Sequence, residues 1–375
     1  MKHIAVPAAR PSFDNISDVL KDMRVVLESG RMILGPYTKA FEDAFAKYTG
    51  VPYAVATGSC TAALEIVLRY IDIKGKEVIV PANTFIACPN SVIYAGGTPV
   101  FAETSGDSFC LDYDDVVKKI TPKTRAVMVV HLAGMPMPEV FKLKRLCKRK
   151  GIFLLEDPSH AHGAMINGKK VGAIGDAGCF SFYPTKIMTT GVGGMITTRN
   201  KALADFAKSS RHHGQGASLE TIETWGSDWV IDELSAVVGI YQLASLEKNV
   251  KKRNVIAARY RRALKKIQGI TSLRVSSSVR HGYYRYLILL DEQIPKKKVL
   301  EALSASGIEA GTLYGLPCYM HTIYRKRGYK RGLCPKTEEL LSRQIALPLF
   351  ATMTRTHVDL VITCLKKVIK TLTPS

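Results

Sequence analysis

Five short apolar runs alternate with helix-forming segments in the first half of the chain, and this alternation constrains the fold more than any other feature. The runs are YAVAT at 53, EVIVP at 77, TPVFA at 98, RAVMVV at 125 and IFLLED at 152. The segments between them have helical patterns at 60–71, 84–95, 112–120 and 138–150. Strands that alternate with helices indicate βαβ units, and largely apolar strands indicate helices on both faces of the sheet. We therefore predict an α/β fold with a mostly parallel central sheet flanked by helices.

The rest of the chain predicts a second, smaller domain. Helices at 14–29 and 38–49, each followed by a glycine, precede the first strand. After the fifth strand, the segments MINGKKVG, DAGCFSF and GVGGMITT are interpreted as hairpin or irregular strands that complete the sheet. An amphipathic helical pattern from Asp232 to Ile267 follows, then a strand beginning at Tyr283, a helix, and a final helix after Thr354. We expect a large domain over 1–245 and a small C-terminal α+β domain over 246–375.

The composition is that of a soluble globular protein. The chain has 375 residues, more than one hydrophobic core usually organises, and 46% of them are hydrophobic and 23% charged. No uncharged apolar run approaches the roughly 18 residues of a membrane span, and the first residues have no run long enough for a secretory signal. The expected compartment is the cytoplasm.

Eight cysteines are present, and none of them forms a C-x-x-C pair. Most lie inside apolar runs, so we interpret them as reduced, buried thiols. No cluster of histidine and cysteine has the spacing of a zinc site, and no metal is predicted.

Positive charge is concentrated in the last third of the sequence. Residues 1–245 hold 27 Lys and Arg against 24 Asp and Glu, whereas residues 246–375 hold 26 against 8. This asymmetry has two interpretations: an anionic partner such as nucleic acid, an acidic membrane or a phosphorylated substrate, or a solvated basic surface. The basic residues form short clusters on polar helix faces or in loops, which favours the solvated surface.

Two of the expected strands end in residues suited to a bound cofactor. Ligands of open α/β sheets bind beyond the carboxyl ends of the strands. Gly58, Ser59 and Cys60 follow the first run and open a helix, whose free N–H groups suit a phosphate, although such a turn can also be purely structural. Phe85 follows the second run, either as a core residue or as a ring at the same edge.

Two further strand ends carry a carboxylate and a lysine. Asp157 follows four apolar residues, and a buried carboxylate needs a cationic partner, which is either a structural ion pair or a protonated pyridine nitrogen. Lys186 follows the apolar segment GCFSF, and a desolvated lysine amine reacts readily with a carbonyl. A phosphate cradle, a stacking ring, an aspartate and a lysine together describe a site for pyridoxal 5'-phosphate (PLP).

Several motifs identify a family resemblance that covers the chain from about Pro7 to its end. The most specific is FSFYPTK at 180–186, and the others include GRMILG at 30–35, the Glu156-Asp157 pair, GDAG at 175–178, His213-Gly214 and DEL at 232–234. In these motifs the chain resembles the DegT/DnrJ/EryC1/StrS family of sugar aminotransferases, which are PLP enzymes of fold type I.

The resemblance implies a role for each candidate residue. Lys186 would form the internal aldimine, Asp157 would pair with the pyridine nitrogen, and Phe85 would stack on the ring. His160 would lie beside the phenolic oxygen of the cofactor. The phosphate would be held by Ser59, the backbone of Cys60, and Ser181, and Gly58 would also belong to the cofactor site. Asp228 would come from the second subunit of a homodimer.

The chain departs from the family pattern at several of these positions. Asp228 stands where the family usually has asparagine, Val230 where it often has arginine, and Val192 where an acidic residue is frequent. Cys60 replaces a glycine or another small residue, and Pro158 replaces alanine or serine. A carboxylate beside a phosphate is repulsive unless it is protonated or turned away, so Asp228 is the departure with the clearest consequence.

The resemblance implies amino transfer from glutamate or glutamine to a keto sugar, nucleotide-linked, by a ping-pong mechanism in which Lys186 is the acid and base. A PLP-dependent sugar dehydratase is an alternative, but such relatives commonly have histidine in place of the lysine. Aminocyclitol-forming or aromatising relatives keep the lysine, so a cyclic ketone substrate stays open. A non-catalytic regulator or nucleic-acid binder is disfavoured because Lys186 and Asp157 are both present and the basic clusters lack interleaved aromatic residues.

Overall fold

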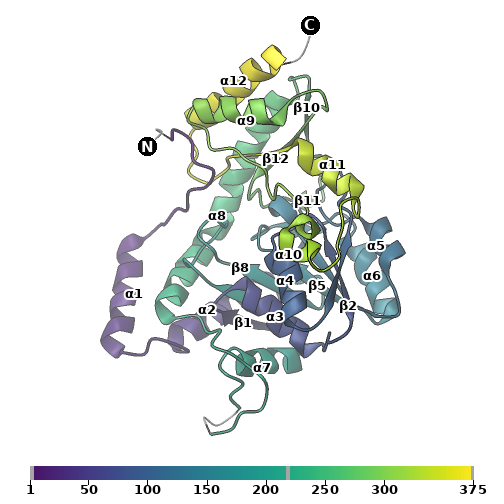
Figure 1. Cartoon of the computed structure of the whole chain (residues 1–375). Helices are drawn as coiled ribbons and strands as arrows, with labels where there is room; N and C mark the ends of the chain where they lie inside the picture. The colour runs from purple at the N-terminus through teal and green to yellow at the C-terminus, as the bar shows by residue number, and fades with distance from the viewer. Residues whose placement is uncertain (1–3, 217–219, 373–375) are drawn as a thin grey trace.

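A seven-stranded sheet forms the centre of the computed structural model, which describes residues 4–216 and 220–372 (Figure 1). Its strand order is β1-β9-β8-β5-β4-β2-β3, and all neighbours pair in parallel except β9, which is antiparallel to both β1 and β8. The strands are β1 (Tyr53–Thr57), β2 (Glu77–Pro81), β3 (Thr98–Ala102), β4 (Thr124–Val130), β5 (Phe153–Asp157), β8 (Ala177–Ser181) and β9 (Gly194–Thr198). The predicted mostly parallel sheet is confirmed.

Helices flank this sheet (Figure 1). Helices α2, α3 and α7 contact β1 and β9, α4 contacts β2 and β3, and α6 contacts β5. The helices of this part of the chain are α1 (Ile16–Ser29), α2 (Pro36–Thr49), α3 (Cys60–Tyr70), α4 (Ala87–Tyr94), α5 (Tyr113–Lys119), the short 3-10 helix η1 (Leu132–Gly134), α6 (Val140–Lys150) and α7 (Lys201–Ser210). Each predicted helix is present, and α1 and α2 end as expected at glycines in the left-handed conformation, Gly30 and Gly50.

The glycine-rich segments after β5 contribute strands to two different sheets. DAGCFSF and GVGGMITT supply β8 and β9, which complete the central sheet as predicted. MINGKKVG instead forms the hairpin of β6 (Met165–Ile166) and β7 (Lys169–Lys170), which pairs with β11 (Val279–Arg280) in a separate small sheet. The prediction was wrong for this hairpin. Asn167 and Gly168, both at positive φ, form its two-residue turn, and β6 pairs with a strand that comes more than a hundred residues later in the sequence instead of with the central sheet.

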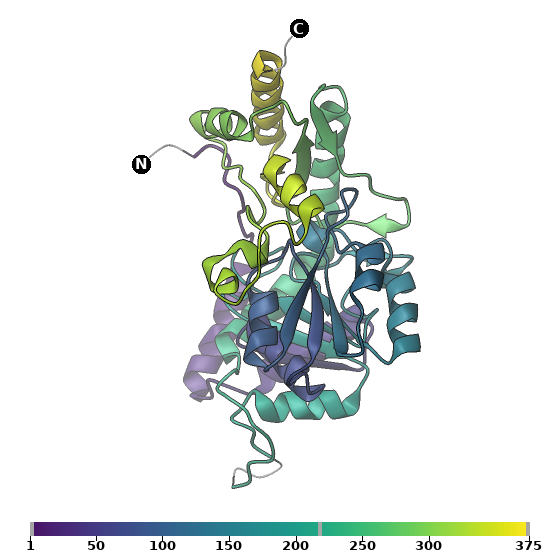
Figure 2. The ribbon, with the colours of Figure 1, turned by 45° about the vertical axis from the view of Figure 1, so that its right-hand side comes forward.

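Most of the elements that follow the central sheet in sequence gather at one end of the large domain (Figure 2). An antiparallel sheet of order β10-β12-β13 lies among helices there and forms an α+β unit with its own hydrophobic core. The elements in this part of the chain are α8 (Glu233–Leu264), β10 (Ile270–Ser272), β12 (Tyr286–Leu290), α9 (Lys296–Ala305), the short 3-10 helix η2 (Cys318–Met320), α10 (Thr322–Arg325), α11 (Pro335–Arg343), β13 (Gln344–Leu347) and α12 (Arg355–Leu372). Of these, η2 and α10 pack against the core of the large domain. Among the described residues, no helix combines the length and the apolar character that crossing a membrane requires.

Helix α8 connects the two cores. Leu246 packs in the core of the large domain, whereas Tyr260 packs in the C-terminal core, and the helix runs without interruption between them. The expected boundary at 245/246 falls inside this helix and stays a prediction. The N-terminal segment also reaches the C-terminal core, because Val6 is fully buried there and forms a parallel bridge with Ile308.

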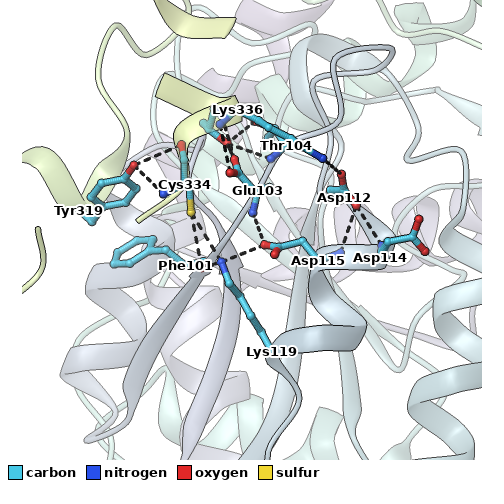
Figure 3. Close-up of polar contacts among 11 residues, drawn as sticks. Phe101, Glu103, Thr104, Asp112, Asp114, Asp115, Lys119, Tyr319, Cys334 and Lys336 are labelled. Atoms are coloured by element: carbon cyan, nitrogen blue, oxygen red, sulfur yellow. Dashed lines mark hydrogen bonds and ion pairs between the residues drawn. The ribbon is translucent and has the colours of Figure 1, made fainter. Parts of the chain in front are cut away.

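A segment of the C-terminal half returns to the large domain through the network of polar contacts in Figure 3. The carboxylate of Glu103, just after β3, accepts hydrogen bonds from the backbone N–H of Lys336 (3.1 Å) and of Thr337 (2.8 Å), and from the Thr337 hydroxyl (2.7 Å). Lys119 donates to the Phe101 carbonyl at 2.7 Å on the same side. We call residues 311–337 the strap, because these contacts hold it across the large domain.

Candidate active site

A cavity of about 440 Å³ lies at the carboxyl ends of the parallel strands. Its size is typical of small-molecule sites. Residues that end or follow β1, β2, β4, β5 and β8 line it, among them Gly58, Ser59, Cys60, Thr84, Phe85, Val130, Asp157, His160, Ser181 and Lys186. The parallel pairing of β4 with β5 sets Val130 beside Asp157, so two strand ends meet at one wall.

The start of α3 forms one side of the cavity. The Ser59 hydroxyl caps this helix by accepting a hydrogen bond from the Ala62 N–H at 3.1 Å, and Cys60 is the first helical residue. Strand β9 passes so close that a Cβ on Gly194 would lie 2.6 Å from the Cys60 nitrogen, which only glycine avoids. The first N–H groups of a helix have no partner within the helix, and the dipole is positive there, so this end of the cavity suits a phosphate.

Asp157 is a buried carboxylate that forms no ion pair with any of the described residues. Its exposed fraction is 5%, Oδ1 accepts a hydrogen bond from the Ser159 N–H at 3.0 Å, and Oδ2 accepts one from the Cys88 thiol at 3.1 Å. Within residues 4–216 and 220–372, the ion pairs with both side chains buried are His131–Glu156 and Arg211–Glu42, and Asp157 belongs to neither. The structural ion pair that the sequence left open is therefore absent from the described residues, and the carboxylate suits a protonated ring nitrogen.

Lys186 also lines the cavity, near an aromatic ring. Its Nζ lies 5.2 Å from the centroid of Tyr284, and the Tyr284 hydroxyl lies 3.0 Å from Oγ1 of Thr185. The guanidinium of Arg285 covers the same ring at 4.3 Å. Burial alone would raise the pKa of Tyr284, but the positive charges of Arg285 and Lys186 and the hydrogen bond with Thr185 outweigh it, so the pKa lies below its usual value.

Phe85 is 55% exposed and lines the cavity, so its ring is not a core residue. Tyr183 is exposed to a similar degree and also lines the cavity. An exposed ring at this position is free to stack on a flat heteroaromatic group.

His160 lies between two tyrosines from the C-terminal half. Its ring is nearly parallel to that of Tyr284, with centroids 4.2 Å apart, and its Nε2 lies 3.0 Å from the Tyr314 hydroxyl. The backbone N–H of Ala133 donates to Nδ1 at 3.4 Å. Burial, with the positive charge of Lys186, holds the pKa of His160 well below its usual value, so the imidazole is neutral.

The predicted site residues thus meet around one cavity, with a single exception. Asp228 does not line the cavity of its own chain; it pairs with His212 in an isolated bridge close to the end of α7. Because the expectation assigned Asp228 to the cavity of a second subunit, its role stays a prediction.

Cys88, Tyr284 and Tyr314 also line the cavity and were not predicted. A search of strand ends does not find them, because Cys88 lies on α4, and Tyr284 and Tyr314 come 86 and 116 residues after the end of β9, the last strand of the central sheet. The sequence interpretation placed a strand from Tyr283, but Tyr283 has φ 51° and β12 begins only at Tyr286. A bulky residue in the left-handed region cannot continue a strand, so this prediction was wrong by three residues, and Tyr284 is turned to the cavity instead.

Comparison with known proteins agrees with this arrangement. The model of the DegT/DnrJ/EryC1/StrS aminotransferase family matches residues 14–366. The spore coat polysaccharide biosynthesis protein SpsC of Bacillus subtilis is 32% identical over 367 residues, which are 94% of this chain and 94% of SpsC.

Two solved structures are similar over nearly their whole length. DesV of S. venezuelae, crystallised with a ketimine intermediate, has a TM-score of 0.91 and 31% identity, and the match covers 97% of this chain and 99% of DesV. PseC of Helicobacter pylori, an aminotransferase involved in the biosynthesis of pseudoaminic acid, has a TM-score of 0.91 and 28% identity, covering 99% of this chain and all of PseC. The predicted fold, fold type I, and the predicted enzyme class, a transaminase, are confirmed. The chain belongs to the DegT/DnrJ/EryC1/StrS aminotransferase family.

Proposed function

We propose that the protein transfers an amino group from glutamate or glutamine to a nucleotide-linked keto sugar, with PLP as its cofactor, in a ping-pong cycle. The observation that carries this proposal is one cavity that holds both a lysine amine, Lys186, and a buried carboxylate without a cation, Asp157. The relatives support a sugar substrate, since PseC takes part in pseudoaminic acid biosynthesis and SpsC in spore coat polysaccharide biosynthesis.

The residues present fit the cofactor. The phosphate would lie at the start of α3, within reach of Ser59, the Cys60 N–H and Ser181, and Phe85 would stack on the ring. Asp157 would pair with the ring nitrogen, and the amine of Lys186 would hold the aldehyde carbon. When bound, PLP supplies an electron sink for the negative charge that develops on a substrate carbon as that carbon loses a proton.

The chain's own residues then hold and move protons. Lys186 Nζ would take the proton from the substrate carbon that bears nitrogen and give it to the former aldehyde carbon of the cofactor, and it would move a proton in the opposite direction when the acceptor reacts, which is acid and base catalysis by one group. Asp157 keeps the ring nitrogen protonated, and the Ser159 N–H and Cys88 S–H fix its carboxylate in place. Because a single cavity contains this base, donor and acceptor would use it in turn, as a ping-pong cycle requires.

The working form is proposed to be a homodimer. Large apolar side chains are exposed on α1 (Ile16, Leu20 and Leu27) and in the segment between α7 and α8 (Ile222 and Trp225, the last 87% exposed). Exposed apolar groups of this size are expected to be covered by another protein surface. A second copy would bring the segment that contains Asp228 to the phosphate end of this chain's cavity.

The first test is chemical labelling of the lysine. Protein loaded with PLP and treated with borohydride should carry the reduced cofactor on Lys186, as read from a peptide map. Lys170→Ala is the matched control, because this partly buried lysine contacts the Tyr48 carbonyl outside the cavity. A label on another lysine, or no label, would overturn the assignment.

The second test is a half-reaction without acceptor. Glutamate alone should bleach the visible absorbance of the loaded protein and release about one 2-oxoglutarate per site, and a nucleotide-linked keto sugar should then restore the absorbance. Continuous release of the keto acid without acceptor would exclude the ping-pong cycle. Release of neither 2-oxoglutarate from glutamate nor 2-oxoglutaramate from glutamine would exclude the proposed donors.

A further inference from the structure

Tyr314 reaches the cavity from the strap and contacts the residues that surround the cofactor site. Its hydroxyl lies 3.0 Å from His160 Nε2, and its ring centroid is 5.8 Å from that of Phe85. No sequence motif pointed to this residue, and the proposed chemistry above gives it no role.

The hydrogen bonds of His160 determine where the Tyr314 proton goes. The Ala133 N–H donates to Nδ1, so Nδ1 carries no proton, and the neutral imidazole must carry its proton on Nε2. Nε2–H therefore donates to the Tyr314 oxygen. The phenolic proton of Tyr314 is left free, and the structure gives it no other acceptor among the described residues.

The backbone of Tyr314 is held in a strained conformation. Its φ is 61°, in the left-handed region that bulky side chains rarely adopt. The chain is fixed on both sides, since Leu313 N–H donates to Gln344 Oε1 at 2.9 Å and Cys318 N–H donates to the Ala82 carbonyl at 2.9 Å. Strain that anchored neighbours maintain is typical of residues that act on a ligand.

The surroundings keep the Tyr314 phenol protonated. Burial raises its pKa well above the usual value, and the negative charge of Asp157 acts in the same direction. Other titratable or charged groups near the pair are Tyr284, Cys88 and Cys318 around Tyr314, and Lys186, Arg285 and His162 around His160. A protonated phenol is a hydrogen-bond donor throughout the range in which the enzyme would work.

We propose that Tyr314, oriented by His160, donates the hydrogen bond to the phenolic oxygen of the bound cofactor ring. This inference rests on the proposed function, and it moves the expected contact from His160 itself to the tyrosine that His160 holds. His160 is then a positioning residue, and the strap of the C-terminal half supplies a cofactor contact to a site built mainly by the large domain.

The test is a pH titration of the visible absorbance of the loaded protein without substrate. A hydrogen-bond donor stabilises the negative charge on the phenolic oxygen of the cofactor. When the donor is removed, this oxygen becomes more basic, and the proton that it shares with Lys186 Nζ is lost at a higher pH. Tyr314→Phe should raise the spectroscopic pKa by about one unit. Fluorotyrosine at position 314, a stronger donor of nearly the same shape, should lower it.

Further variants test whether His160 orients Tyr314, and a control variant tests for a general effect of removing a buried hydroxyl. His160→Phe keeps a ring against Tyr284 and should shift the spectroscopic pKa in the same direction as Tyr314→Phe, while the double variant should show no more than the shift of Tyr314→Phe alone. Tyr324→Phe is the matched control, because this buried strap tyrosine donates to Asn90 Oδ1 at 2.7 Å away from the cavity.

An unchanged spectroscopic pKa in Tyr314→Phe or with fluorotyrosine would overturn the inference, and so would an equal shift in Tyr324→Phe. Additive shifts in the double variant would remove the positioning role of His160. Failure of the unaltered chain to bind PLP is a different result, because it contradicts the proposed function itself.

Discussion

At the scale of single residues, the carboxylate of Asp157 is held in one orientation by its hydrogen bonds. Its two oxygens are already occupied by the Ser159 N–H and the Cys88 thiol, and burial raises the pKa of that thiol well above its usual value, so the thiol stays a donor. Two donors fix the plane of the carboxylate, and its remaining lone pairs can accept from a ligand in the cavity that Asp157 lines. The charge of Asp157, rather than its shape, is what the proposed chemistry uses.

Asp157→Asn should therefore keep the fold and still bind PLP, with affinity lower by roughly tenfold, since one charge-assisted hydrogen bond becomes a neutral one. Amino transfer should fall by about 100-fold or more, because an amide cannot hold the ring nitrogen protonated. Asp176→Asn is the control: this carboxylate accepts from the Leu154 N–H at the other end of β5. Near-normal turnover of Asp157→Asn would remove the proposed role.

The sequence identified those site residues that stand at strand ends, because a parallel sheet brings its carboxyl ends to one edge whatever the rest of the chain does. It did not identify Tyr314, whose place depends on a strained φ and on anchors at Gln344 and Ala82. Contacts of this kind arise from tertiary packing and have no local pattern.

At the scale of elements, Glu156 connects β5 to the loop between β7 and β8 and to His131. This fully buried carboxylate accepts hydrogen bonds from the N–H groups of Gly172, Ile174 and Gly175 and lies 2.9 Å from His131 Nε2. Burial raises its pKa, but His131 and the backbone donors outweigh burial, so the pKa lies below the usual glutamate value. The loop between β7 and β8 depends on this one side chain.

Glu156→Gln should lower the free energy of unfolding by about 3 kcal/mol at neutral pH. Because the pKa is lower in the folded than in the unfolded chain, the stabilisation is complete above the ordinary glutamate pKa and is lost as the pH falls through the folded value. Denaturant unfolding at several pH values should thus show a difference between wild type and variant that shrinks in acid. The exposed Glu301→Gln should show almost no difference, and a gap for Glu156→Gln that widened in acid would contradict the assignment.

Elements with strong periodicity were predictable, including the helices and the parallel strands. The hairpin of β6 and β7 was not, because its pairing partner β11 lies more than a hundred residues away in sequence. Periodicity reports which face of an element is buried and carries no information about which distant strand pairs with it.

At the scale of the whole molecule, Asp228 tests the proposed dimer. If the segment that contains it reaches the partner's phosphate, Asp228→Asn removes a repulsive charge and should tighten PLP binding several-fold in the dimer. PLP affinity should be measured together with the molecular mass in solution, and the exposed Asp205→Asn, a carboxylate of α7, serves as the control. Unchanged or weaker binding in Asp228→Asn would mean that the carboxylate points elsewhere.

The bridge between Val6 and Ile308 has a consequence for how the protein is made. On a ribosome, about 300 residues must follow Val6 before its partner exists, which takes roughly 15 to 60 s at ordinary elongation rates. During that time the leading end of the chain cannot occupy its final place, although most of the central sheet has already been synthesised. The C-terminal core therefore includes a segment that was synthesised about 300 residues earlier, and a nascent chain that stalls before residue 308 keeps the segment around Val6 undocked.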